Sequence, residues 1–289
     1  GLEASLDDYL RGIKGNPASQ LWWSNLLYGM DPKGLNVRLS IDLYLQNRAD
    51  EMMVSERGAV VLLNAKSGEI LAMASHPTFN PNHLAESGAD FISNPTKPLL
   101  NRATLGQYPT GSIMQPFIQS LYGDNQVSDS NLINMYKTFG FYQAPQIQLP
   151  VSPPSSETAL DTMRVSPLQM ALAAAALSNH GMIPAPRIAM AVNTPSEGWV
   201  SLPALGKPFE ALSTSAADEA AISYLVNNQS YWQYFSQAQE SGSNFTWYVG
   251  GTTPNWQATP LVIVVLLEDD NERLAKRIGQ ELLVNAMHP

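Results

Sequence analysis

The stretch "GAVVLLNAKSGEILAMAS", residues 58–75, decides the fold class of this 289-residue chain. Two runs rich in Val, Leu, Ile and Ala flank a polar turn at residues 65–68, which is the pattern of two antiparallel strands joined by a short connection. Both runs are apolar nearly throughout, so we expect both faces of the hairpin to be covered by other parts of the chain. The hairpin therefore predicts a sheet with helices packed against it.

Three segments outside the hairpin have helical patterns. Residues 42–54 carry apolar side chains at helical spacing. "SPLQMALAAAALSNHG", residues 166–181, begins with a serine suited to an N-cap and a proline suited to the first helical position, and it ends on a glycine. Residues 215–226 predict a further helix, with Ser215 near its start. The alanine-rich second helix has a thin body that neighbouring elements can approach closely.

The C-terminal part of the chain predicts two strands and a closing helix. The strands are expected over residues 244–250 and 260–268, and an amphipathic helix over 271–286. Residues 94–98 and 149–157 are proline-rich and predict loops. The order of hairpin, helices, strands and closing helix indicates an α/β (α+β) fold, in which both ends of the chain complete one sheet with helices packed on it.

Composition excludes several classes of function. The formal charge of −9 and the scattered lysines and arginines argue against a nucleic-acid partner. The chain has no cysteine, which excludes disulfides and thiolate chemistry, and its four histidines lack metal-ligand spacing, so we expect no metal and no cofactor. The longest apolar run, residues 261–267, suits a buried strand rather than a membrane span. We expect any membrane attachment to come from a segment absent from this chain.

Six segments match the pattern of one known family, in order and across nearly the whole chain. They are "GLEASLDDYLRGIKG" (1–15), "VRLSIDLYLQNRAD" (37–50), "GAVVLLNAKSGEILAMASHPTFNPN" (58–82), "NRATLGQYPTGSIMQPF" (101–117), "RVSPLQMALAAAALSNHGMIPAPRI" (164–188) and "WYVGGTTPNWQATPLVIVVLLEDD" (247–270). On these residues the chain resembles the transpeptidase domain of penicillin-binding proteins, especially the class B type.

This resemblance implies the antiparallel, helix-flanked fold that serine β-lactamases share. It implies a linker segment over residues 1–35 and a transpeptidase-like domain, with a shortened helical subdomain, over residues 36–289. It also implies a place outside the cytoplasmic membrane among cell-wall synthesis or division proteins, with a peptidoglycan stem peptide or a β-lactam as ligand. In the family a serine attacks that peptide, and the acyl group then passes to an amine of a neighbouring strand.

The family's first motif is Ser-x-x-Lys, in which the lysine activates the serine. Here the four residues are Ser112-Ile113-Met114-Gln115, and the glutamine cannot serve as a general base. Ser-x-x-Gln is also the pattern of a capping box, in which the two side chains satisfy backbone groups at a helix start. Ser112 is therefore either a candidate nucleophile or a helix cap, and we favour the cap.

The other two family motifs are altered as well. No Ser-x-Asn occurs between Ser112 and residues 138–143, and residues 127–134 predict a polar turn leading into a short helix. The Lys-Thr-Gly strand aligns with "YFSQAQ", whose first four residues occupy the substrate-binding position: Tyr234, Phe235, Ser236 and Gln237. Residues 250–254, "GGTTP", superficially resemble the third motif, but we interpret them as a loop.

Three hypotheses follow from these changes. The leading one is a degenerate domain that has lost transpeptidation and acts as a scaffold or binding module. The second is an atypical acyl-serine transpeptidase or carboxypeptidase that uses Ser112, with backbone N–H groups of Ser112 and Gln237 as the oxyanion hole and Tyr108 or Tyr234 as base. The third is a sensor that binds muropeptides or β-lactams. An open pocket in the structure would favour the sensor, whereas a cleft filled by Tyr234 and Phe235 would favour the scaffold.

Overall fold

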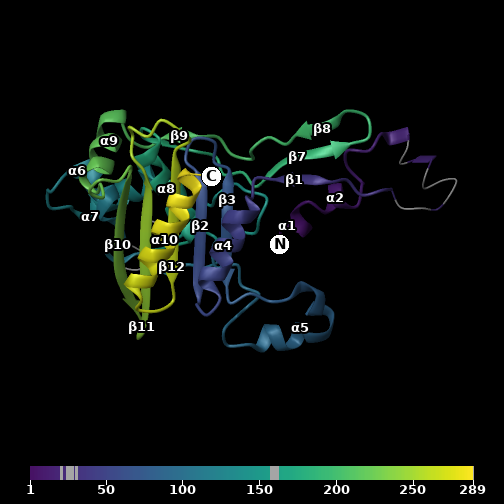
Figure 1. Ribbon diagram of the computed structural model, residues 1–289, viewed down its shortest axis with the longest axis horizontal. Coiled ribbons are helices and arrows are strands. Elements are labelled where there is room, and N and C mark those ends of the chain that lie inside the picture. Colours follow the sequence, from purple (N-terminus) through teal and green to yellow (C-terminus); the bar gives the residue numbers. More distant parts are fainter. Residues whose placement is uncertain (20–21, 24–28, 30–31, 157–162, 289) are drawn as a thin grey trace.

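The computed structural model describes residues 1–19, 22–23, 29, 32–156 and 163–288. Its centre is a five-stranded antiparallel sheet in the order β10-β11-β12-β2-β3 (Figure 1). The sheet therefore joins the hairpin to strands from the other end of the chain, as the sequence predicts. The strands are β2 (Gly58–Asn64), β3 (Ile70–His76), β10 (Tyr231–Glu240), β11 (Ser243–Thr252) and β12 (Leu261–Leu267).

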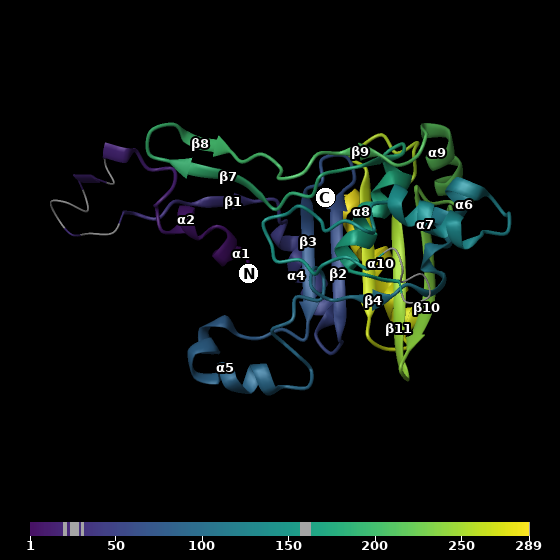
Figure 2. The same cartoon turned by 180° about the vertical axis from the view of Figure 1, so that it is seen from behind.

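Helices cover both faces of this sheet. The apolar residues of β2 alternate between two buried clusters: Val61 packs with helix α8 (Pro167–Ser178), and Leu62 packs with α4 (Leu43–Met53) and α10 (Glu272–Met287). Figure 2 shows α8 in front of the sheet and α10 behind it. This double burial explains the unbroken apolar run of β2, while β3 at the edge alternates buried and half-buried side chains.

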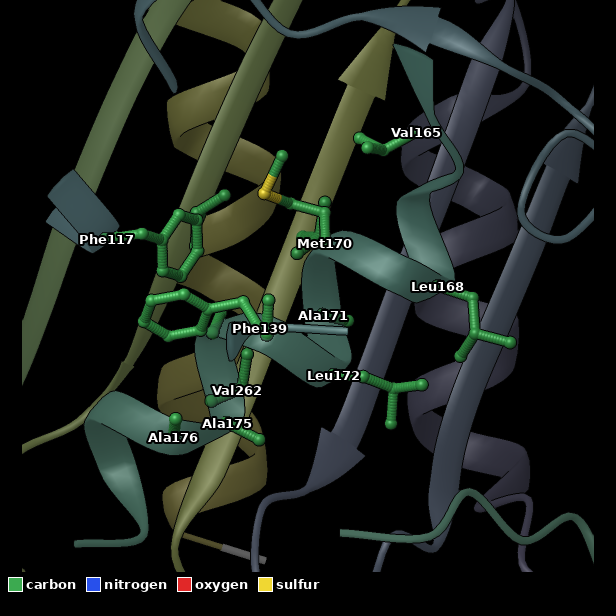
Figure 3. Close-up of a cluster of buried hydrophobic side chains, with 14 of the residues drawn as sticks. Phe117, Phe139, Val165, Leu168, Met170, Ala171, Leu172, Ala175, Ala176 and Val262 are labelled. Carbon is green, nitrogen blue, oxygen red and sulfur yellow. The ribbon is translucent and has the colours of Figure 1, made fainter. Parts of the chain in front are cut away.

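Helix α8 is the buried centre of the domain. Every residue from Pro167 to Ser178 is buried, and the helix begins with a capping box in which Ser166 and Gln169 satisfy each other's backbone groups. At its other end, Ser178 Oγ accepts a hydrogen bond from Trp232 Nε1 at 2.9 Å. Side chains of α8 meet Phe117 and Phe139 in the cluster of Figure 3. The predicted start of this helix is confirmed.

Two smaller parts extend from the sheet. A three-stranded sheet, β1-β7-β8, lies with α1 and α2 to one side of the molecule, and α5 lies apart below the main sheet (Figure 1). The bounds are α1 (Leu2–Ser5), α2 (Asp7–Leu10), β1 (Val37–Leu39), α5 (Leu84–Ser93), β7 (Ala189–Thr194) and β8 (Gly198–Ser201). None of these elements was predicted, and the boundary at residue 35 stays a prediction.

Short elements complete the described chain. They are η1 (Pro81–His83), β4 (Tyr108–Pro109), η2 (Gly111–Met114), α6 (Gln115–Tyr122), α7 (Asp129–Thr138), β5 (Arg164–Val165), β6 (Met182–Ile183), β9 (Phe209–Glu210) and α9 (Thr214–Ser223). No helix in the described ranges has the length and apolar character that crossing a membrane requires.

The helix predicted over residues 215–226 is α9, which begins at Thr214 with Ser213 as its N-cap, so Ser215 lies near its start as predicted. One local prediction was wrong. Gly250 to Thr252 belong to β11, so the loop begins only at Thr253. Gly251 suits this strand because a Cβ there would lie 2.4 Å from Ser178 Oγ, so the close packing of α8 requires a glycine.

Candidate active site

Ser112 lies in the 3-10 turn η2, which leads directly into α6. The structure contradicts the predicted capping box. The N-cap of η2 is Thr110, and neither Ser112 Oγ nor the Gln115 side chain makes a hydrogen bond within the described residues. Both side chains are exposed. The reason is that Ser112 lies inside the 3-10 turn Gly111–Met114, whereas a capping residue stands just outside the first turn.

Gly111 holds this turn against the edge strand β10. Its φ is +52°, and a Cβ at this position would lie 2.9 Å from the Gln237 carbonyl oxygen and 3.0 Å from the Ala238 Cβ. Both the backbone conformation and the close approach therefore require glycine. The contact places Ser112 beside the segment that aligns with the Lys-Thr-Gly strand, so the structure brings the sequence-predicted residues together.

The side chains of β10 alternate between the two faces of the sheet. Tyr234 packs with the cluster around α8, whereas Phe235 packs with the cluster around α10, where the Lys276 Nζ lies 5.1 Å from its ring centroid. Tyr234 and Phe235 therefore do not fill one cleft together, because neighbouring residues of a strand face opposite ways. Ser236 faces the same way as Tyr234, and its buried Oγ has no partner among the described residues.

Tyr234 rests against Tyr224, which follows the last turn of α9. The ring centroids are 5.2 Å apart in an edge-to-face arrangement. Burial, together with the neighbouring Tyr234 and Asp124, raises the pKa of Tyr224 to about 12. An aromatic pair thus occupies the end of β10 at which the family pattern has a lysine, and Tyr224 stays uncharged at neutral pH.

The outer edge of β10 retains backbone hydrogen-bonding groups. The Gln233 N–H donates to the Tyr224 carbonyl at 3.1 Å, away from β11. Because N–H groups of an antiparallel strand alternate in direction, those of Phe235 and Gln237 also point outward. The Gln237 backbone therefore faces the turn that carries Ser112. Its side chain points elsewhere, since Gln237 Nε2 donates to Asp270 Oδ1.

The sequence was compared with models of known protein families and with characterised proteins. Residues 58–132 match the family model "Penicillin binding protein transpeptidase domain". The peptidoglycan D,D-transpeptidase MrdA of Acinetobacter baumannii is 38% identical over 126 residues, which is 40% of this chain and 19% of that protein. MrdA of Escherichia coli K12 is 34% identical over 90 residues, 29% of this chain and 14% of that protein. The predicted resemblance to penicillin-binding-protein transpeptidase domains is therefore supported by the residues that these comparisons match.

Solved structures agree on the fold of this family. Penicillin-binding protein A of Mycobacterium tuberculosis, as its imipenem acyl-enzyme complex, has a TM-score of 0.79 at 20% identity, covering 100% of this chain and 87% of that one. The D,D-transpeptidase domain of a peptidoglycan glycosyltransferase from Eggerthella lenta has a TM-score of 0.76 at 18% identity, covering 99% and 86%. The matched segments of the curated relatives span about a fifth of their length or less.

Helix α7 occupies the region in which a penicillin-binding protein carries Ser-x-Asn. Ser128 caps this helix by accepting from the Asn131 N–H at 3.4 Å, and its Oγ also lies 2.8 Å from that of Ser130. Asn134 Nδ2 donates to Tyr122 Oη at 3.0 Å. The predicted polar turn and short helix are confirmed. The hydrogen bonds of these serines and asparagines lie within α7 and to Tyr122, and none of them is to Ser112.

Tyr108 cannot act as base for Ser112. It is buried, and its hydroxyl donates to Glu268 Oε1 at 2.9 Å. Burial, with the charge and hydrogen bond of Glu268, raises the pKa of Tyr108 well above the ordinary tyrosine value. The phenol therefore holds its proton more tightly than usual and directs it toward Glu268, which contradicts the role considered from the sequence.

Histidines and tryptophans lie outside this site. His76 pairs with Asp50, and His180 pairs with Asp218, each at 2.9 Å. Trp232 and Trp247 are buried in the core. The described ranges contain no group of His, Cys, Asp and Glu that could hold a metal ion.

The sequence analysis missed Gly111 and Tyr224 as parts of the site. A glycine directly before the serine could have indicated that the backbone there packs closely against another strand.

Proposed function

We propose that this domain works in peptidoglycan assembly as a binding or scaffold module that does not turn over its ligand. The proposal places it on the outer side of the cell membrane, among proteins of cell-wall synthesis or division. The observation that carries it is the environment of Ser112. The exposed serine has Gln115 at the lysine position, and no basic side chain of the described residues bonds to it.

The chemistry of serine nucleophiles supports this proposal. A serine hydroxyl attacks poorly near neutral pH unless a neighbouring group takes its proton. A glutamine amide does not accept a proton under these conditions. Loss of a positioned general base lowers rates by about 10²- to 10⁴-fold. Tyr108 is also not available as a base for Ser112, because its hydroxyl donates to Glu268.

The test is covalent labelling by a penicillin. The 289-residue chain is incubated with excess benzylpenicillin for several hours, and intact mass spectrometry is used to look for the added mass, with Ser112→Ala as the matched control. We expect no adduct in either protein. An adduct in the unsubstituted chain that Ser112→Ala abolishes would refute the non-catalytic reading.

A second candidate function is slow acyl transfer through Ser112, and two observations favour it. The Ser112 hydroxyl is exposed and is not engaged as a cap. The outward Gln237 N–H lies beside the turn, where a backbone donor can stabilise an oxyanion without any particular side chain. A Ser112-dependent adduct that accumulates over hours in the same experiment would support this candidate instead.

A further inference from the structure

A second site lies behind the segment that leads into the Ser112 turn. It is a cavity of about 290 Å³ between the loop around residues 95–108 and the end of β12. Its lining is unusually rich in cations for a chain of net charge −9. The polar lining residues are Arg57, Lys97, Arg102, Gln107, Arg164 and Glu268.

The inner wall of this cavity is a closed ion-pair network. Arg102 Nε donates to Glu268 Oε1 at 2.7 Å, and the remaining Arg102 donors reach the carbonyls of Lys97 and Thr96 at 3.1 and 2.6 Å. Arg57 Nη2 donates to the other oxygen of Glu268 at 2.8 Å. Glu268 is thus fully engaged by groups on the wall, and its carboxylate is shared between two arginines.

The charges of the described residues do not balance within the cavity. Four cationic side chains and one carboxylate line it, and Arg164 also pairs with Glu240 at 2.7 Å. Two positive charges therefore stay unmatched. Lys97 also lines the cavity, and it has no ion-pair partner in the described part of the chain.

Gln107 supplies an independent sign that a ligand belongs here. Its backbone carbonyl accepts from Arg164 Nε at 3.1 Å, which fixes the residue at the cavity wall. Both its side-chain amide atoms are buried, and neither has a hydrogen-bond partner. Buried amides are ordinarily satisfied, so an unpartnered one that lines a cavity points to a bound polar group.

We propose that this cavity binds a phosphate group, carried either by free phosphate or by a phosphate monoester. Two unmatched cations suit a dianion, and guanidinium groups match the geometry of phosphate oxygens. Gln107 also lines this cavity, and its side-chain amide has no partner among the described residues. The volume accommodates one tetrahedral anion with a few waters. This site is independent of the proposed function, because none of these groups contacts Ser112.

The test is titration calorimetry on the full chain at constant ionic strength, with three probes: orthophosphate, glycerol 3-phosphate and malonate. Binding of both phosphates in preference to malonate is expected. Tighter binding of glycerol 3-phosphate than of orthophosphate would identify a monoester as the natural source, and the reverse would identify free phosphate. Equal binding of malonate would overturn the phosphate assignment.

Two variants and a matched control locate the site. Lys97→Gln removes one charge at the cavity and should weaken phosphate binding by about tenfold or more, since a hydrogen bond to a charged group is lost. Gln107→Leu should weaken it similarly, with circular dichroism as the folding check. Lys207→Gln removes the same charge from an exposed lysine that lines a different cavity. An equal loss in Lys207→Gln, or no loss in Lys97→Gln, would refute the site.

Discussion

Ser112 and Gln115 lie three residues apart on one exposed side of the turn that begins α6, and neither side chain bonds to the other. Residues at this spacing are neighbours on a helical turn. The arrangement that brings a nucleophile and its base together in this family is therefore kept, while the group with base chemistry is absent. The turn itself is fixed by the contact of Gly111 with Gln237.

Restoring the base should restore part of the reactivity. Gln115→Lys places an amine next to the Ser112 hydroxyl, and we expect benzylpenicillin to acylate this variant within the hours over which the unsubstituted chain gives no adduct. Intact mass spectrometry over a time course measures this acylation. Gln115→Arg is the control, because its guanidinium carries charge but accepts no proton. If both variants react equally, charge rather than base chemistry is responsible.

The Arg102–Glu268 pair should be a main contributor to the stability of the loop before Ser112. Arg102 is 1% exposed, so Arg102→Leu leaves a buried carboxylate without its principal partner and should lower the free energy of unfolding by about 3–5 kcal/mol. Arg57 contacts the same carboxylate, but its side chain is 52% exposed, so Arg57→Gln should cost about 1 kcal/mol or less. Urea unfolding of both variants tests the contrast. Equal losses would contradict it.

Glu268 should also make stability depend on pH. Burial alone would raise the pKa of this carboxyl, but the hydrogen bond and charge of Arg102, with bonds from Tyr108 and Arg57, lower it below the ordinary value of 4.5. A carboxyl with a lowered folded-state pKa contributes stability that is present above pH 4.5 and is lost as the pH falls through the folded value. Urea unfolding between pH 7 and pH 3 should show this decline.

The variant Glu268→Gln tests the assignment to this residue. It should be less stable than the unsubstituted chain at pH 7, and its free energy of unfolding should fall less steeply below pH 4.5. Asp50, whose pKa burial would raise but whose bonds from His76 and Gln46 lower, contributes a decline of the same sign that remains in this variant. An unchanged slope in Glu268→Gln would show that Glu268 does not titrate as inferred.

Two glycine-to-alanine substitutions in helices should have opposite effects. A Cβ at Gly279 in α10 would lie 2.1 Å from the ring of Tyr248, which is fully buried, so Gly279→Ala should destabilise the domain by about 1–3 kcal/mol despite its higher helix propensity. Gly88 in α5 has nothing within 4 Å, and Gly88→Ala should stabilise it by up to about 1 kcal/mol. Thermal unfolding compares them, and a shift of the same sign in both would contradict this packing argument.

The central fold could be predicted from the sequence because its signals are local. The apolar runs of the hairpin, the Ser166 cap and the Pro167 start of α8 each specify their own structure without reference to distant residues. In the outer sheet, β7 and β8 form a local hairpin that the sequence analysis did not identify. Strand β1 was missed because it is three residues long and pairs with β7, about 150 residues away. Such pairing depends on tertiary contacts that periodicity does not report.

The site was predicted in position but not in detail. The alignment of Tyr234 to Gln237 with the edge strand placed these residues beside Ser112, as the structure has them. The prediction that Ser112 caps a helix was wrong. The sequence Ser-Ile-Met-Gln is compatible with a capping box and with a 3-10 turn, and only the backbone conformation distinguishes these two structures. The separation of Tyr234 from Phe235 follows from strand alternation and could have been read from the sequence once the strand was placed.

The six-residue link between α6 and α7, residues 123–128, affects how the altered motifs of this domain could change by mutation. A lysine at position 115 is within reach of substitution, so the first motif could return by point mutation. A Ser-x-Asn triplet would also need one change, Ser130→Asn after Ser128, but it would then lie at the start of α7, whose N-cap is Ser128. The letters of both motifs are therefore within reach of single substitutions, whereas the position of the second relative to Ser112 is set by where α7 begins.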